Sequence, residues 1–300
     1  MGWDILKIVA LYNQCKKTYG FVSEHHVLLK TTVETYLKQT LPRTVEDFIT
    51  DYDLMDSVKK CLPEIPEKFG ESDRISLTKT RVLAPLSNPP KILCLGLNYI
   101  NHAEEQGTSA SEDPTLFMKP RTAINGPYDE IIKPKWVNQL DYECELAVVI
   151  GKRGKEILES EAMKYILGYM VINDVSARDI QYKDKQWTRG KSFDTFAPLG
   201  PWITTADEIR DPHRLTIKTL VNGEIRQNSS TEKMFIKIPQ IICSLSRVMT
   251  LEPGDVIATG TPAGVGIWMK PTPRFLKDGD VVEMSISGLG SIKNMISQGI

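Results

Sequence analysis

The chain has 300 residues, of which 41% are hydrophobic and 25% are charged, a composition typical of a soluble globular protein. Its formal net charge of −1 gives no electrostatic reason to expect nucleic acid or a membrane surface as a partner, so we expect a small-molecule ligand. No apolar run approaches the roughly 20 residues that span a bilayer, and we see no signal peptide, so we predict a cytoplasmic protein. The 5 cysteines include no Cys-x-x-Cys pair, which indicates reduced thiols and argues against a soft-metal site.

Residues 1–88 differ in character from the rest, and we expect them to form a small N-terminal α/β domain before a catalytic domain at 89–300. Their patterns predict one hairpin and two helices, at 8–12 with 21–29, then at 33–38 and 45–60. The proline-rich segment 85–90 is predicted to be a linker.

From residue 91 onward, turn signals separate short apolar runs. An Asn-Gly pair predicts a hairpin between 215–221 and 224–227, and further turns precede strands at 256–259 and 281–286. Helices are expected only at four places: 99–106, 159–165, 177–184 and 238–249. Strands dominate, so we predict an α+β fold with an antiparallel or mixed sheet that is rolled or sandwiched.

Residues 141–150 alternate acidic and apolar side chains up to Glu145 and then become wholly apolar, which predicts a strand entering the interior. Glu143 and Glu145 then project from one face of that strand. A second apolar strand, 169–174, ends in Asp174. Three buried carboxylates require a cation, and oxygen ligands favour Mg²⁺ or Mn²⁺, with Ca²⁺ as a possible occupant in crystals. The alternative for an isolated Glu-x-Glu is a solvated face of a sheet.

His102 and Glu105 are three residues apart in a predicted short helix, so their side chains share a face and are within hydrogen-bond reach. A carboxylate beside an imidazole raises its basicity, which is what activation of water requires. The alternative is an ordinary surface contact. The polar segment 108–114 follows directly, and we expect it to let the helix move as a lid.

Further polar residues surround these motifs. Arg178 and Gln181 share a helix face that suits recognition of a carboxylate, although a structural salt bridge is the alternative for Arg178. Lys191 follows Gly190 and is placed to bring a positive charge to an anionic intermediate, unless it is an ordinary solvated lysine. The glycine-rich segment 258–266 contains Thr261 and offers backbone N–H groups to a carboxylate, and Lys119 adds another basic group.

Taken together, these motifs resemble the fumarylacetoacetate hydrolase superfamily, in particular its shorter members. The matching stretches are 96–102, 117–120, 141–151, 173–179, 190–201 and 259–266. The resemblance implies a mixed β-roll catalytic domain that is usually dimeric, so we expect a homodimer. It also implies three groups of site residues: metal ligands Glu143, Glu145 and Asp174; catalytic His102, Glu105 and Lys191; and substrate-binding Arg178, Gln181 and Thr261. We expect Lys119, as a basic group near the same pocket, to bind substrate as well.

The activity implied is that of a divalent-metal-dependent hydrolase that cleaves a C–C bond in 2,4-dioxo acids such as acylpyruvates. The metal polarises the 2-oxo oxygen, so that an enolate is stabilised when the bond breaks. An alternative on the same site is an isomerase or decarboxylase of 2-hydroxyhepta-2,4-diene-1,7-dioate or oxaloacetate-type substrates. A more remote alternative is a non-catalytic metal-binding dimer.

Overall fold

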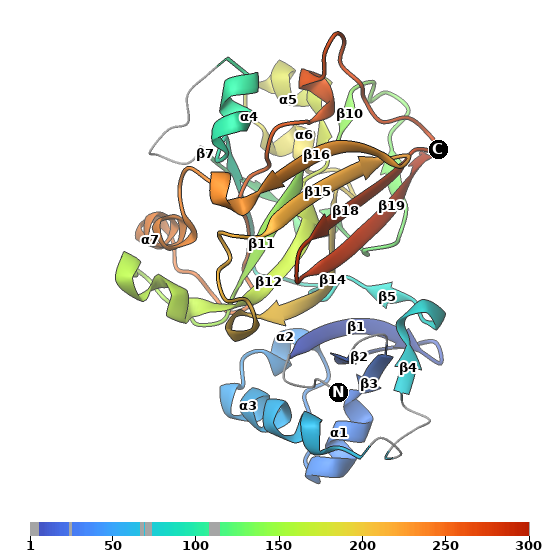
Figure 1. Cartoon of the computed structure of the whole chain (residues 1–300), viewed down its shortest axis with the longest axis vertical. Coiled ribbons are helices and arrows are strands. Elements are labelled where there is room, and N and C mark those ends of the chain that lie inside the picture. Colours follow the sequence, from blue (N-terminus) through green and yellow to red (C-terminus); the bar gives the residue numbers. More distant parts are fainter. Residues whose placement is uncertain (1–5, 24–25, 67–68, 70–73, 108–114, 300) are drawn as a thin grey trace.

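A computed structural model describes residues 6–23, 26–66, 69, 74–107 and 115–299 of the chain. The elements before residue 85 lie at one end of the long axis, and the remaining elements form the larger part of the molecule (Figure 1). The arrangement confirms the prediction of a mixed sheet fold with several helices.

The larger sheet has 12 strands within these described ranges. Ten of them follow one path: β4 (Arg74–Ser76), β3 (His26–Leu29), β2 (Lys16–Ser23), β1 (Lys7–Asn13), β14 (Ala197–Thr205), β12 (Ile166–Asn173), β11 (Cys144–Ile150), β17 (Val256–Ala258), β6 (Ile92–Gly96) and β7 (Thr115–Lys119). Two short strands lie off this path, β5 (Val82–Leu83) on β1 and β8 (Ile124–Asn125) on β14. The sheet is mixed because β17 pairs with β6 in parallel, whereas β11 pairs with β12 antiparallel.

The predicted N-terminal hairpin is present, with Ile8 of β1 opposite Phe21 of β2. The predicted second strand is divided into β2 and β3, which pair antiparallel. On its other side β1 pairs with β14, where Ile8 lies opposite Ile203. The sheet therefore continues from the first 88 residues into the rest of the chain, and one buried apolar cluster includes side chains from both parts. Division into two domains at residue 88 stays a prediction.

The single helix predicted at 45–60 is wrong, because the structure has two helices, α2 (Val45–Phe48) and α3 (Tyr52–Cys61). The break follows from capping, since the Asp51 carboxylate accepts a hydrogen bond from the Leu54 N–H at 2.9 Å and starts a new helix. The helix predicted at 33–38 is present as α1 (Lys30–Leu37).

The predicted linker at 85–90 is held against α2. The Glu46 carboxylate accepts hydrogen bonds from the backbone N–H groups of Ser87 and Asn88, at 2.7 and 2.9 Å. This stretch is therefore fixed in place by side-chain contacts, which composition alone does not indicate.

A second sheet packs against the first. Its strands are β16 (Glu224–Ser230), β15 (Thr216–Val221), β18 (Val281–Ile286), β19 (Gly290–Gln298) and β9 (Ile131–Lys133). The predicted hairpin at Asn222-Gly223 is confirmed, with Val221 opposite Glu224. Leu146 of β11 shares a buried apolar cluster with Ile217 and Met284 of this second sheet, so the two sheets form one core.

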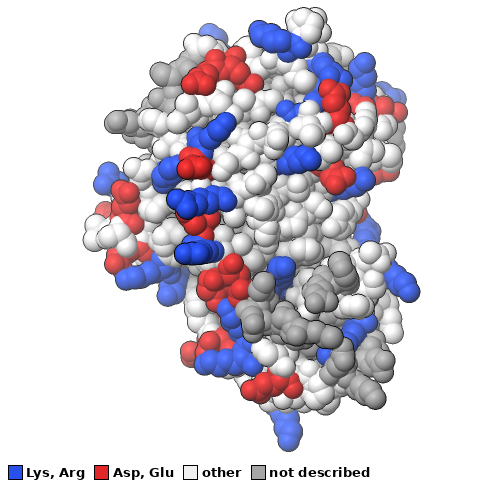
Figure 2. All heavy atoms as spheres, in the orientation of Figure 1, with Lys and Arg blue, Asp and Glu red and all other residues white. Residues whose placement is uncertain are grey.

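Short elements connect and cover the sheets. They are the helices α4 (Ile100–Glu105), α5 (Arg178–Asp184), α6 (Thr188–Lys191) and α7 (Ile238–Val248), the strand pair β10 (Leu140–Asp141) with β13 (Ser176–Ala177), and the 3₁₀ turns η1 (Leu62–Glu64), η3 (Leu77–Lys79), η4 (Arg121–Ala123), η5 (Glu159–Tyr165), η6 (Ala206–Glu208), η7 (Thr231–Lys233) and η8 (Gly266–Trp268). The helix predicted at 159–165 is thus a 3₁₀ turn. No helix among the described residues is long and apolar enough to cross a membrane. Lys and Arg side chains are intermixed with Asp and Glu over the face shown in Figure 2.

Candidate active site

Three buried carboxylates meet where β11 and β12 lie side by side. Antiparallel pairing puts Cys144 opposite Asn173, so that Glu143 and Asp174 are neighbours, and the Asp174 N–H donates to the Glu143 carbonyl at 2.9 Å. Glu145 joins them from β11, and one oxygen from each of the three carboxylates lies within 4.8 Å of the others. The side-chain positions agree with the predicted metal cluster and not with a solvated sheet face, since these residues are 5%, 1% and 0% exposed.

Basic side chains neutralise two of these carboxylates. The Lys191 ammonium lies 2.7 Å from Glu143 Oε2 and 2.6 Å from Asp174 Oδ2, and the Lys119 ammonium lies 2.7 Å from Asp174 Oδ1. Burial alone would raise the pKa of Glu143, but the positive charges of Lys191 and Arg178 hold that pKa below its ordinary value. Burial likewise opposes the charge on Lys191, yet Asp174 and Glu143 raise the pKa of its ammonium, which keeps it protonated.

Glu145 has a different environment. Its Oε2 accepts a hydrogen bond from the Gly260 N–H at 2.7 Å, and no ion pair to it is found among the described residues. Burial and then the negative charges of Asp174 and Glu143 raise the pKa of Glu145 well above its usual value. A divalent cation bound beside Glu145 would stabilise its ionised form. The available ligand atoms are carboxylate oxygens, which such cations prefer. The residues present therefore fit a hard divalent metal ion.

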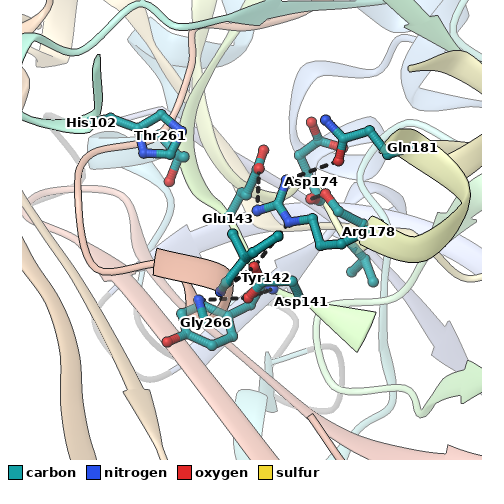
Figure 3. Close-up of polar contacts among 12 residues, drawn as sticks. His102, Asp141, Tyr142, Glu143, Asp174, Arg178, Gln181, Thr261 and Gly266 are labelled. Atoms are coloured by element: carbon teal, nitrogen blue, oxygen red, sulfur yellow. Dashed lines mark hydrogen bonds and ion pairs between the residues drawn. The ribbon is translucent and has the colours of Figure 1, made fainter. Parts of the chain in front are cut away.

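Arg178 is fixed by three neighbours (Figure 3). Its Nε donates to Asp141 Oδ2 at 2.9 Å, its Nη1 donates to Gln181 Oε1 at 3.0 Å, and its Nη2 lies 2.7 Å from Glu143 Oε1. Burial opposes the charge of Arg178, but Glu143 and Asp141 raise the pKa of its guanidinium. The structure thus brings Arg178 and Gln181 together beside the metal cluster, with the guanidinium already engaged by the protein.

Sequence reasoning missed the role of Asp141. Its carboxylate accepts hydrogen bonds from the backbone N–H groups of Gly266 and Ile267, at 2.7 and 3.1 Å, as well as from Arg178 (Figure 3). It therefore joins the Arg178 side chain to the glycine-rich segment. The available signal was an acidic residue at the start of the same strand motif that carries Glu143.

The glycine-rich segment binds the chain's own carboxylates. The N–H groups of Gly260, Gly264 and Gly266 donate to Glu145, Glu105 and Asp141, at 2.7, 3.1 and 2.7 Å respectively. The Thr261 hydroxyl donates to the Cys144 carbonyl at 2.9 Å and accepts from the Gln227 amide at 2.8 Å. These groups hold the site together, and this differs from the free carboxylate cradle expected from the glycine pattern.

The Lys119 ammonium, like the Arg178 guanidinium, already contacts other groups of the protein. Besides its contact with Asp174, its ammonium donates to the carbonyl oxygens of Val175, Lys191 and Phe196, at 3.1, 2.5 and 2.9 Å. It therefore holds the end of β12 against the segment after α6. Its predicted contact with substrate stays a prediction.

The predicted pair of His102 and Glu105 is formed on α4, where His102 Nδ1 lies 2.7 Å from Glu105 Oε1. His102 is 5% exposed, which agrees with a site residue and not with a surface contact. Gln106, which the prediction overlooked, places its amide nitrogen 2.7 Å from the other ring nitrogen, Nε2. The lid predicted at 108–114 lies outside the described residues.

Seven of the ten predicted site residues line a common cavity of about 40 Å³, whereas Glu105, Asp174 and Lys119 are not among its lining residues. Its walls include His102, Gln106, Glu143, Glu145, Arg178, Gln181, Tyr182, Trp187, Lys191 and Thr261. Trp187 closes one side against Gly96, where an added Cβ would lie only 2.0 Å from the indole ring. The volume is that of about one or two water molecules.

A sequence model described as the fumarylacetoacetate (FAA) hydrolase C-terminal domain matches residues 91–297. The chain belongs to the fumarylacetoacetate hydrolase superfamily. It is therefore related to a group of enzymes, as the motifs indicated.

Among members of this superfamily, a Xenopus laevis protein named mitochondrial oxaloacetate tautomerase is 49% identical over 74% of this chain and 70% of its own length. A solved fumarylacetoacetate hydrolase from Exiguobacterium antarcticum is 37% identical, with a TM-score of 0.81 over 98% of this chain and 100% of that one. A solved 2-hydroxyhepta-2,4-diene-1,7-dioate isomerase from Mycobacterium marinum is 32% identical, with a TM-score of 0.75 over 98% of both chains. The superfamily relatives are thus named for isomerisation as well as for hydrolysis.

Proposed function

We propose that the protein catalyses keto–enol tautomerisation of oxaloacetate or a closely related 2-oxo diacid, with a divalent cation held by Glu143, Glu145 and Asp174. The observation that carries this proposal is the buried carboxylate cluster with the Lys191 ammonium beside it. Such a site suits a substrate that passes through an enolate. The name of the frog relative supports tautomerisation as the reaction, ahead of the hydrolysis expected from the sequence.

Mg²⁺ or Mn²⁺ would act there as a Lewis acid on a 2-oxo oxygen of the substrate. In this proposal the Lys191 ammonium, which lies 2.7 Å from Glu143 Oε2, donates a hydrogen bond to the substrate oxygen that gains negative charge. The hydrogen at C3 of oxaloacetate is acidic because C3 lies between two carbonyl groups. Its removal therefore needs less catalysis by the protein than activation of a water molecule does. One proton leaves C3 and another joins the 2-oxo oxygen, so no atom is gained or lost.

Hydrolysis of 2,4-dioxo acids is the second candidate, and the His102–Glu105 pair is the observation that favours it. In that reaction His102 takes a proton from water while the water oxygen bonds to C4. The C3–C4 bond then breaks, its electrons pass to C3, and C3 takes up a proton, so that pyruvate and a carboxylic acid are formed. Decarboxylation of oxaloacetate would use the same site, with loss of CO₂ in place of a proton.

The test is an assay of the purified protein with Mg²⁺, Mn²⁺ or EDTA. Oxaloacetate, acylpyruvates and diene diacids are the substrates, and enol absorbance and pyruvate release are followed together. A metal-dependent change in oxaloacetate enol absorbance without pyruvate supports the tautomerase. Pyruvate with a matching carboxylic acid supports the hydrolase, whereas no metal-dependent change with any substrate contradicts both.

A second experiment uses the His102→Ala variant to distinguish tautomerisation from hydrolysis. General acid–base catalysis contributes about 10²–10⁴-fold, so hydrolysis of an acylpyruvate should fall by that factor. Tautomerisation of oxaloacetate should fall far less. Full hydrolytic turnover by His102→Ala would remove the hydrolase candidate.

The remaining expectations also belong to this proposal. We propose that Arg178, Gln181, Thr261 and Lys119 orient the substrate carboxylates, either directly or by holding their neighbours. A homodimer stays part of the proposal, and size-exclusion chromatography with light scattering tests it.

A cytoplasmic location also stays a prediction, since the frog relative is named mitochondrial. Fractionation of cells that express the tagged protein distinguishes the two compartments.

A further inference from the structure

Gln106 directly follows α4, and its side chain turns back onto His102. Its amide nitrogen lies 2.7 Å from His102 Nε2, and its backbone N–H donates to the Ala103 carbonyl at 3.2 Å, which fixes it at the end of the helix. Gln106 is also one of the residues that line the active-site cavity. None of the roles assigned above uses this side chain.

The contact at His102 Nδ1 determines which group the Gln106 amide faces at Nε2. His102 Nδ1 lies 2.7 Å from Glu105 Oε1, and a carboxylate oxygen only accepts hydrogen bonds, so Nδ1 carries a hydrogen. In the neutral ring, Nε2 then has the free lone pair, which is the basic position. The Gln106 amide is the donor that faces this lone pair.

Both nitrogens of the imidazole are therefore occupied by protein groups. Water can lose a proton to Nε2 only after the Gln106 amide has moved away, because the lone pair accepts one strong hydrogen bond. Hydrolysis needs that proton transfer, whereas tautomerisation of oxaloacetate consumes no water.

We propose that Gln106 is a specificity-determining residue that caps the basic nitrogen of His102 and so favours tautomerisation over hydrolysis. This inference rests on the proposed function. The chemistry that Gln106 excludes is attack of water on the C4 carbonyl of a 2,4-dioxo acid. It acts through His102 and is therefore a positioning residue.

The variant that tests this is Gln106→Leu, which removes the amide and keeps a similar volume. Glu104→Gln is the matched control, because Glu104 lies in the same helix and its side chain is exposed. A neutral hydrogen bond contributes about 0.5–1.5 kcal/mol, so its loss should raise kcat for acylpyruvate hydrolysis by about 2- to 10-fold. KM should change little, and the ratio of acylpyruvate hydrolysis to oxaloacetate tautomerisation should rise by the same factor.

A second readout is independent of turnover. In metal-free protein labelled with ¹⁵N-histidine, the His102 Nε2 resonance should move toward that of a free acceptor nitrogen in Gln106→Leu, and stay in place in Glu104→Gln. His102→Ala identifies this resonance among the 4 histidines of the chain.

Three outcomes are separable. An unchanged Nε2 resonance in Gln106→Leu overturns the proposal that Gln106 caps His102. A ratio of hydrolysis rate to tautomerisation rate no higher than in the wild-type protein overturns it as well. A wild-type protein that hydrolyses acylpyruvates and does not tautomerise oxaloacetate contradicts the proposed function, and with it the selectivity assigned to Gln106. A shifted resonance together with a raised ratio supports the inference.

Discussion

At the scale of single residues, the site pairs buried charges of opposite sign. Lys191 bridges Glu143 and Asp174, and Arg178 contacts Glu143 as well, so two of the three carboxylates are compensated by the protein. Glu145 is the carboxylate left with a single backbone hydrogen bond in this arrangement. Because buried charge without compensation is costly, Glu145 is the residue whose ionised form depends most on a cation.

We predict that Glu145→Gln weakens Mg²⁺ binding by at least about tenfold, because an amide oxygen keeps the shape of the ligand but carries no negative charge. Isothermal titration calorimetry on the folded variant measures this change. The exposed Glu104→Gln serves as the control and should bind Mg²⁺ as the wild-type protein does. Unchanged Mg²⁺ affinity in Glu145→Gln would contradict the proposed metal centre.

At the scale of secondary-structure elements, α5 and α6 are packed closely enough to position Lys191. Gly190 lies at their contact, and a Cβ there would be 2.7 Å from the Gln181 backbone nitrogen and 3.0 Å from the Ala177 carbonyl oxygen. These neighbours are backbone atoms and cannot move independently. Gly190 therefore permits the close approach that places Lys191 over the carboxylates.

We predict that Gly190→Ala lowers the free energy of unfolding by about 1–3 kcal/mol, the usual cost of overpacking a tight contact. The proposed tautomerase activity should fall as well, because α6 must shift away from α5 and carry Lys191 with it. Urea denaturation followed by circular dichroism measures the stability change. Lys183→Ala, at an exposed position of α5, is the control, and equal stability of the two variants would contradict the prediction.

At the scale of the whole molecule, the first 88 residues and the catalytic part share a sheet. β1 pairs with β14 through Lys7 opposite Thr204 and Ile8 opposite Ile203. Phe48 from the N-terminal part and Leu199 from β14 belong to the same buried cluster. Burial of apolar area stabilises the folded state by roughly 25 cal/mol per Å². The two parts therefore stabilise each other through this shared cluster.

We predict one cooperative thermal transition for the complete chain, with equal calorimetric and van't Hoff enthalpies, because neither part can unfold without exposing the shared core. Differential scanning calorimetry measures both enthalpies. Circular dichroism recorded on the same sample is the control and should give the same midpoint. Two separated transitions would instead favour an independent N-terminal domain at residues 1–88.

Local sequence was enough to predict several parts of the fold and site. The hairpin at Asn222-Gly223 depends on turn chemistry, and the contact between His102 and Glu105 depends on helical spacing, so neighbouring residues determine both. The acidic ends of two apolar strands also identified the residues of the carboxylate cluster before the strands were known to be adjacent.

Other features depended on residues far apart in the chain. The contacts of Lys119 and Lys191 with Asp174, and that of Arg178 with Asp141, join separate strands and helices, and no local pattern specifies such pairs. The break between α2 and α3 was also missed, since Asp51 acts as a cap where helical periodicity alone predicted one continuous helix. The sequence by itself thus determined which groups form the candidate site. Tertiary structure decided how their charges are compensated, because burial brings distant groups into one low-dielectric site.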